Sequence, residues 1–260
     1  MAISLDSISR STGIKAPALA LYGPAGVGKP SFGAGAPNTV FLQTEDGLGK
    51  LSVDAFPMMT SFQDVVDAIT VLYTSDHQYQ TLVLDSLDHL EPLVWQHLCD
   101  HYVGPKGERY SSIEDFGYGK GFILALDLWR QLLDGLFALR NEKGMAFILI
   151  AHSEIKRFES PSTDSYDRYQ IKLHKRASDL IQESVDCVLF ADYKTVIEKE
   201  DAGFNKTKTR GISTGQRYLY TEARPSFVAK NRYGLPAELP LNWQAFSDAL
   251  SNNLSQQKGD

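Results

Sequence analysis

The sequence predicts an α/β fold with a mainly parallel central sheet, helices on both faces and β-hairpin elements near the C-terminus. Short apolar runs rich in β-branched and aromatic residues alternate with segments of helical period along most of the chain. This alternation is typical of strand–helix–strand units around a parallel sheet. Two long polar stretches interrupt it, and strand-like residues dominate from Tyr193 onward.

The individual elements follow from local patterns of apolar residues. Helical spacing predicts helices over about 62–72, 87–98, 122–137 and 243–254, and Ser61 with Asp64 has the spacing of a capping box for the first helix. Two further segments, 194–198 and 216–221, are predicted to pair as a hairpin across a polar span. The apolar runs that we expect to form the sheet are 18–22, 39–44, 81–85, 146–151 and 186–191.

Chain length favours one elaborated domain. The 260 residues show no internal repeat and no Pro-rich linker, so we expect a single domain over 1–255 with a frayed tail at 256–260. The two polar stretches, at about 103–121 and 153–176, are longer than ordinary connections. We therefore interpret them as functional insertions.

Composition excludes several classes of protein. The 32 acidic and 26 basic residues give a net charge of −6, so contact with nucleic acid has to be local. The longest apolar run, 145–151, is too short to span a bilayer, which excludes a membrane protein. The first residues lack the pattern of an export signal and there are 2 cysteines, so we expect a reduced, cytoplasmic protein.

A glycine-rich segment has the spacing of a phosphate-binding loop. Gly23 is followed, after four residues, by Gly28 and Lys29, directly after the first predicted strand. Glycines let backbone N–H groups converge on phosphates, and the lysine reaches the β- and γ-phosphate oxygens. The spacing predicts an ATP site whose candidate residues are Gly23, Pro24, Ala25, Gly26, Val27, Gly28, Lys29, Pro30 and Ser31.

Pro30 departs from this pattern. The residue after the lysine is ordinarily Ser or Thr, whose hydroxyl ligates Mg²⁺, and proline supplies no hydroxyl. Ser31 lies about 100° further around a helix and could replace that ligand only after a register shift. We expect weakened nucleotide binding and still weaker hydrolysis, although proline is tolerated in the first helical turn.

Three polar residues follow predicted strands. Asp85 ends an apolar strand, which is where P-loop enzymes carry an aspartate that binds Mg²⁺. Asp85 is therefore a candidate metal ligand, together with the Ser31 hydroxyl. Glu45 follows the second strand, where a carboxylate could polarise an attacking water or simply lie in solvent. His152 follows the strand 146–151 and is either a sensor of the γ-phosphate or a structural residue.

The order of these motifs resembles the RecA-type ATPases. The segments are GPAGVGK, TED, LVLDS, ILIAHS and RPSFVAKNRYGLP, and they are most similar to phage-encoded ATP-binding proteins of recombination and single-strand annealing, the Sak/UvsX-like group. The resemblance covers about 15–240. It implies a RecA-like P-loop core, binding of ATP and Mg²⁺, and a bacterial host cytoplasm as the location.

The resemblance also implies roles for particular residues. Glu45 corresponds to the glutamate that activates water, Asp85 to the Mg²⁺-binding acid and His152 to the γ-phosphate sensor. Lys230 and Arg232 correspond to cations that enter the nucleotide site of a neighbouring subunit, which implies self-assembly into a ring or filament; the alternative is an ordinary charged surface. A single-strand binding protein or an exonuclease is an implied partner.

In that family, two inserted loops hold single-stranded DNA. The second insertion here combines six basic with four acidic residues and has aromatic residues between them, which suits backbone attraction with base stacking. A solvated loop without that role is the alternative. The candidate DNA-binding residues are Lys156, Arg157, Phe158, Arg168, Tyr169, Lys172, Lys175 and Arg176, with Lys106 and Arg109 in the first insertion.

Three functions fit the sequence. The first is a DNA-dependent ATPase that assembles on single-stranded DNA for recombination or annealing. The second is an annealing or filament protein in which nucleotide is only a structural switch, and Pro30 favours it. The third is a ring-helicase motor or loader.

Overall fold

The computed structural model describes residues 4–5, 8, 15–160, 164–201 and 207–257. Its centre is a ten-stranded sheet whose main path runs β10-β8-β7-β1-β5-β4-β2-β3. Two strands lie off this path, with β6 paired to β5 and β9 paired to β7. The α/β class with a mostly parallel sheet is thereby confirmed.

Five strands form the parallel core in the order β2-β4-β5-β1-β7. All five predicted strands are present, although β5 and β7 continue well beyond their predicted ends. The edge strand β3 (Asp54–Ala55) adds a short parallel pairing to β2. The core strands are β1 (Ala18–Gly23), β2 (Thr39–Gln43), β4 (Thr81–Asp85), β5 (Ala146–Phe158) and β7 (Cys187–Asp201).

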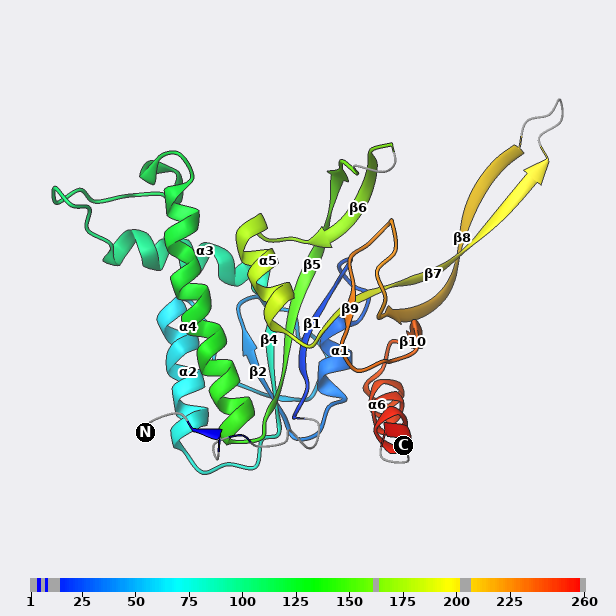
Figure 1. Ribbon diagram of the computed structural model, residues 1–260, viewed down its shortest axis with the longest axis horizontal. Helices are drawn as coiled ribbons and strands as arrows, with labels where there is room; N and C mark the ends of the chain where they lie inside the picture. The colour runs from blue at the N-terminus through cyan, green and yellow to red at the C-terminus, as the bar shows by residue number, and fades with distance from the viewer. Residues whose placement is uncertain (1–3, 6–7, 9–14, 161–163, 202–206, 258–260) are drawn as a thin grey trace.

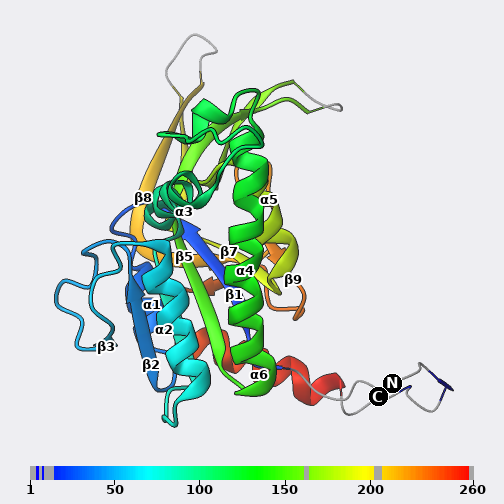
Figure 2. The ribbon, with the colours of Figure 1, turned by 90° about the vertical axis from the view of Figure 1, so that its left-hand side faces the viewer.

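Helices cover both faces of this core. Alternate residues of β1 belong to two separate apolar clusters, with Tyr22 in one and Leu21 in the other, because successive strand residues point to opposite faces. Figures 1 and 2 show α2, α3 and α4 over one face, and α1 and α6 on the other side. The helices are α1 (Lys29–Ala34), α2 (Phe62–Thr74), α3 (Leu87–His101), α4 (Lys120–Glu142), α5 (Lys175–Ser184) and α6 (Trp243–Gln257).

The predicted capping box begins α2. The Ser61 side chain accepts a hydrogen bond from the Asp64 backbone N–H at 3.1 Å, and Asp64 Oδ2 accepts from the Ser61 N–H at 2.9 Å. Two backbone donors of the first turn are therefore satisfied reciprocally, which defines where this helix begins.

Three segments project from the upper side of the sheet in Figure 1, where the parallel strands end. The first is the loop between α3 and α4, which contains the 3₁₀ helix η2 (Ile113–Phe116). The second is a hairpin of β5 with β6 (Tyr166–Ile171), and the third pairs β7 with β8 (Thr207–Tyr220). Most of the expected insertion 153–176 is therefore regular structure, because β5 extends to Phe158 and α5 begins at Lys175.

The C-terminal part completes the sheet with β9 (Lys230–Asn231) and β10 (Glu238–Pro240). A hairpin is present here as β7 with β8, but its register differs from the prediction: 195–198 pair with 210–213 of the expected polar span, and 217–220 pair with 190–193. Of the expected tail, 256–257 belong to α6 and 258–260 lie outside the described residues.

Candidate functional site

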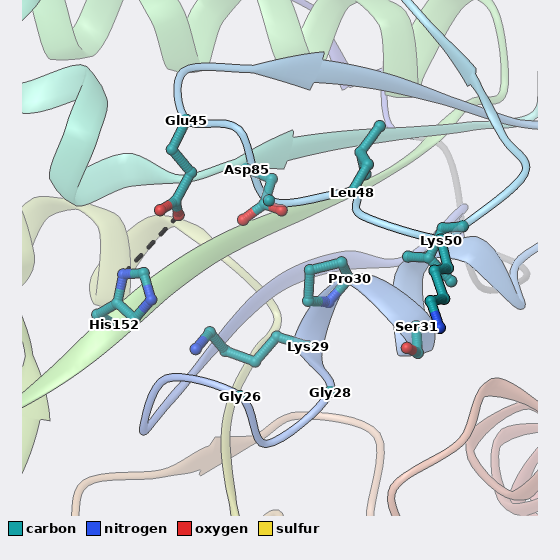
Figure 3. Close-up of a pocket in the computed structure, with 12 residues that line it drawn as sticks. Gly26, Gly28, Lys29, Pro30, Ser31, Glu45, Leu48, Lys50, Asp85 and His152 are labelled. Atoms are coloured by element: carbon teal, nitrogen blue, oxygen red, sulfur yellow. Dashed lines mark ion pairs between the residues drawn. The ribbon is translucent and has the colours of Figure 1, made fainter.

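A cavity of about 410 Å³ lies at the carboxyl ends of the parallel strands, beside the first residues of α1. Ligands of open parallel sheets gather at this edge. Residues from β1, β2, β4 and β5, or from the turns that follow them, contribute to its wall (Figure 3). Its lining residues are Gly26, Gly28, Lys29, Pro30, Ser31, Glu45, Gly47, Leu48, Lys50, Leu51, Asp85 and His152.

The turn between β1 and α1 has the backbone of a phosphate-binding loop. Gly26 and Gly28 have φ values of 75° and 104°, which side chains other than glycine rarely adopt. Lys29 is buried, and its Nζ donates hydrogen bonds to the carbonyls of Gly23 at 3.0 Å and Pro24 at 2.9 Å. Burial lowers the pKa of this ammonium, while nearby Asp85 raises it. The lysine is therefore held by carbonyls that phosphate oxygens could replace.

Pro30 is accommodated at the start of α1 and does not displace the helix. The helix begins at Lys29, and the Phe32 N–H donates to the Gly28 carbonyl at 3.2 Å. Figure 3 shows Ser31 on the side of Lys50, beyond Pro30 as seen from Asp85. The register shift that would make Ser31 a metal ligand has not occurred, so this part of the metal prediction is not supported by the geometry.

Asp85 is the buried carboxylate of the cavity. Burial raises its pKa to about 6, and the negative charge of Glu45 adds to the shift. Mg²⁺ is usually held by one or two protein carboxylates, substrate phosphates and water, so Asp85 fits such an ion even though Pro30 removes the hydroxyl ligand. A bound Mg²⁺ would neutralise phosphate charge here.

Glu45, in the turn after β2, and His152 of β5 come together. The distance between Glu45 Oε1 and His152 Nδ1 is 3.8 Å (Figure 3). His152 is held in turn by Asp88, which accepts hydrogen bonds from the His152 backbone N–H at 3.0 Å and lies 3.0 Å from Nδ1. Burial alone would raise the pKa of Asp88, but these bonds hold it well below its usual range. The contact of Asp88 with His152 could not be predicted from the sequence, because an acid in the first turn of a helix is common.

A protein-family model described as an AAA domain matches residues 15–233, which are most of the chain. The chain belongs to this AAA domain family. Among solved structures, a RadB recombinase matches at a TM-score of 0.44 and 14% identity, over 90% of this chain and 91% of that one. A search of curated proteins found no match. In the described part of this AAA domain, no helix is long and apolar enough to cross a bilayer.

Arg217 of β8 reaches the phosphate-binding loop of this AAA domain from the far end of the chain. Its Nη1 donates to the Val27 carbonyl at 3.3 Å and lies 2.5 Å from where a Cβ on Gly28 would stand. Arg217 as a whole residue is exposed, so it lies at the surface beside the loop. Nothing in the local sequence marks it, because it is separated from the loop by 190 residues.

We expect Arg217→Ala to weaken ATP binding by roughly 3- to 10-fold, because the loop loses a hydrogen bond worth about 1 kcal/mol. Titration of a fluorescent ATP analogue measures the change. Arg130→Ala, on the exposed face of α4, is the matched control and should bind as the unaltered chain does. Equal affinity of the two variants would show that Arg217 does not support the loop.

Lys230 and Arg232 differ in availability. The Lys230 ammonium donates to the carbonyls of Gln182, Glu183 and Val185, at 2.7, 2.9 and 2.7 Å, and so caps the C-terminal end of α5 in the same chain. Arg232 is more exposed, although its Nη1 lies 3.7 Å from Asp186 Oδ1 and its Nη2 donates to the Glu183 carbonyl at 3.3 Å. The expectation that Lys230 enters the nucleotide site of a neighbouring subunit is therefore not supported, because three carbonyls of its own chain hold this ammonium.

The cationic candidates of the second insertion meet beside the β5–β6 hairpin. A second cavity, of about 390 Å³, lies between the hairpin and α5. The Arg168 guanidinium stacks 3.9 Å from the Phe158 ring, and Arg168 Nε is buried without a hydrogen-bond partner. The candidates that line this cavity are Lys156, Arg157, Phe158, Arg168 and Lys175.

The remaining candidates lie elsewhere. The Tyr169 ring is partly buried and stacks on the core residue Phe190 at 5.2 Å, so the expectation that it stacks on a base is not supported. Lys172 Nζ lies 3.8 Å from Asp88 Oδ2, and Arg176 is exposed on α5. Figure 1 shows the loop between α3 and α4, with the exposed candidates Lys106 and Arg109, on the opposite side of α4 from the hairpin.

Proposed function

We propose that this AAA domain is a RecA-like ATPase that assembles on single-stranded DNA in recombination or strand annealing, as the Sak/UvsX-like proteins it resembles do. One observation carries the proposal: β5 leads from the nucleotide cavity, at His152, directly into the hairpin with the cationic cavity. A single strand therefore joins the place where ATP would be hydrolysed to the place where DNA would bind.

The proposed chemistry assigns one task to each residue of the cavity. The backbone of the loop and Lys29 bind the phosphates, and Asp85 with the phosphates holds Mg²⁺. Glu45 orients the attacking water and accepts its proton. His152 responds to the γ-phosphate, and Asp88 connects it to Lys172, just after the last residue of β6.

Self-assembly is part of the proposal. Arg232 is exposed, and an arginine that enters the adjoining subunit's cavity would stabilise charge on the transferred phosphoryl group. Turnover would then depend on assembly, and so on the DNA that organises the subunits. A single-strand binding protein or an exonuclease would act with it.

Pro30 favours a second candidate, in which nucleotide is a structural switch and is turned over slowly or not at all. The loop and Lys29 still offer phosphate ligands, whereas the hydroxyl ligand of Mg²⁺ is missing. In this version the chain anneals DNA without needing hydrolysis.

The test of both candidates is the ATPase rate with and without single-stranded DNA, measured on this chain and on Pro30→Thr in parallel. We expect DNA to stimulate the rate, and the threonine to increase Mg²⁺-dependent turnover by roughly tenfold or more, since a recovered ligand is worth about 1.4 kcal/mol or more. Annealing that is indifferent to ATP would support the switch. Absence of both ATP binding and DNA binding would contradict the proposal.

A combined variant tests the DNA-binding surface. Four exposed cations beside the hairpin, Lys156, Arg157, Lys175 and Arg176, are replaced by Gln. We expect weaker binding of single-stranded DNA and a salt dependence whose logarithmic slope falls by about 3, because each phosphate contact contributes about 0.7. Lys106→Gln with Arg109→Gln is the comparison for the loop between α3 and α4. An unchanged slope in the fourfold variant would remove the hairpin from the DNA surface.

A further inference from the structure

We propose that Glu45, His89 and His152 form a binding site for a transition-metal dication, beside the position expected for Mg²⁺. The three residues come from three elements: the turn after β2, the first turn of α3 and β5. The three side chains would bind the metal when no nucleotide is present. The site therefore goes beyond the proposed function and does not depend on DNA.

The distances already suit a small metal ion. One ligand atom from each residue lies within 4.8 Å of the others. Glu45 Oε2 is 3.3 Å from His89 Nδ1, and Glu45 Oε1 is 3.8 Å from His152 Nδ1. Zn²⁺ bonds of 2.0–2.1 Å in tetrahedral geometry place neighbouring ligand atoms about 3.3 Å apart. Small side-chain rotations would complete the coordination.

The ligand types select the class of metal. Two imidazoles and one carboxylate suit Zn²⁺, Co²⁺ or Mn²⁺, whereas Mg²⁺ prefers an octahedron of oxygens. Three protein ligands leave a coordination position open for water or for an oxygen of the nucleotide. The chemistry is thus distinct from that expected at Asp85.

The surroundings favour a cation and leave it an entry path. Asp85 and Asp88 add carboxylates around the three ligands, against the ammonium groups of Lys29 and Lys172. Asp88 Oδ2 lies 3.0 Å from His152 Nδ1 and 3.6 Å from His89 Nδ1, so a metal at these nitrogens would replace both contacts and would have the Asp88 carboxylate as a neighbouring anion. The His89 side chain is 45% exposed, which opens the cluster to solvent.

His89 has one other hydrogen-bonding neighbour, Ser86, whose Oγ lies 2.9 Å from Nδ1. A metal at this nitrogen would take the place of that contact, and the serine hydroxyl could turn to another acceptor. Because the metal would also hold Glu45, we expect Zn²⁺ to lower any ATP turnover that depends on this carboxylate.

The experiment is a titration of tag-free, nucleotide-free protein with Co²⁺, followed by visible absorption, and then displacement by Zn²⁺ in a calorimeter. We expect one equivalent to bind with the absorption of a low-symmetry, four- or five-coordinate ion. His89→Ala and Glu45→Gln should each reduce the affinity by roughly tenfold or more. His101→Ala, on the exposed part of the same helix, should leave it unchanged.

The His101→Ala variant also tests for a competing metal site. The His101 ring stacks on His97 at 4.1 Å, and such a pair of histidines can itself bind metal. Equal affinity in His89→Ala and the unaltered chain, loss of binding only in His101→Ala, or no bound Co²⁺ would each overturn the proposal. Circular dichroism confirms that the variants fold. ATP binding is measured separately, so failure of the metal site is distinguishable from failure of the proposed function.

Discussion

Replacing Glu45 with Gln should reduce ATP turnover by roughly 10²- to 10⁴-fold, the contribution of a positioned general base, while ATP binding stays nearly unchanged. The amide fills the same space but cannot accept the proton of the attacking water. The carboxylate lies in the cavity beside His152, and Lys29 and Asp85 line the same cavity, so the substitution leaves the phosphate-binding groups in place.

The measurement is single-turnover hydrolysis of Mg-ATP on single-stranded DNA, with binding of a fluorescent ATP analogue recorded on the same protein. Asp46→Asn is the matched control, since Asp46 is the adjacent acid and is exposed. If Glu45→Gln hydrolyses ATP as fast as Asp46→Asn does, Glu45 is not the base.

Asp85→Asn should have two opposite effects: greater stability of the nucleotide-free protein at neutral pH, and loss of Mg²⁺-dependent ATP binding. The pKa of Asp85 is raised from an ordinary 3.8 to about 6, first by burial and then by Glu45. A raised carboxyl pKa means that folding disfavours the charged form. The favourable contribution of the Asp85 carboxyl to the free energy of unfolding is therefore fully present below about pH 4. It is lost as the pH rises through about 6.

The size of the stability effect follows from that shift. Each pKa unit is about 1.4 kcal/mol, so removing the charge should raise the free energy of unfolding by about 2–3 kcal/mol above pH 7. Below pH 4 the difference should vanish. Urea unfolding at a series of pH values without Mg²⁺ measures it, and Asp134→Asn on the exposed side of α4 provides the control. A pH-independent difference would mean that Asp85 is not the titrating group.

The same titration affects metal binding. Mg²⁺ requires the ionised carboxylate, so Mg²⁺-dependent ATP binding by the unaltered chain should weaken as pH falls through about 6. In Asp85→Asn any residual Mg²⁺-dependent binding should lack this pH dependence, because the side chain at position 85 can no longer ionise. This comparison separates Asp85 from Glu45, whose replacement leaves the Mg²⁺ ligand intact.

Much of the fold and part of the site could be predicted because they depend on local interactions. The period of apolar residues defines strands and helices, a short side chain at Ser61 caps a helix, and only glycine readily adopts the φ of 104° found at Gly28. The convergence of Glu45, Asp85 and His152 followed from their positions after parallel strands, whose carboxyl ends share one edge of the sheet.

The sequence by itself determined the parallel core, the phosphate-binding loop and the position of Pro30 directly after its lysine, since each is encoded within a few neighbouring residues. Only the tertiary structure decided which distant side chains meet: Arg217 with the loop, Asp88 and His89 with His152 and Glu45, and Lys230 with the end of α5. It also packed Tyr169 against Phe190 of the core. These contacts depend on how complete elements pack, and packing is determined by the free energy of the whole chain.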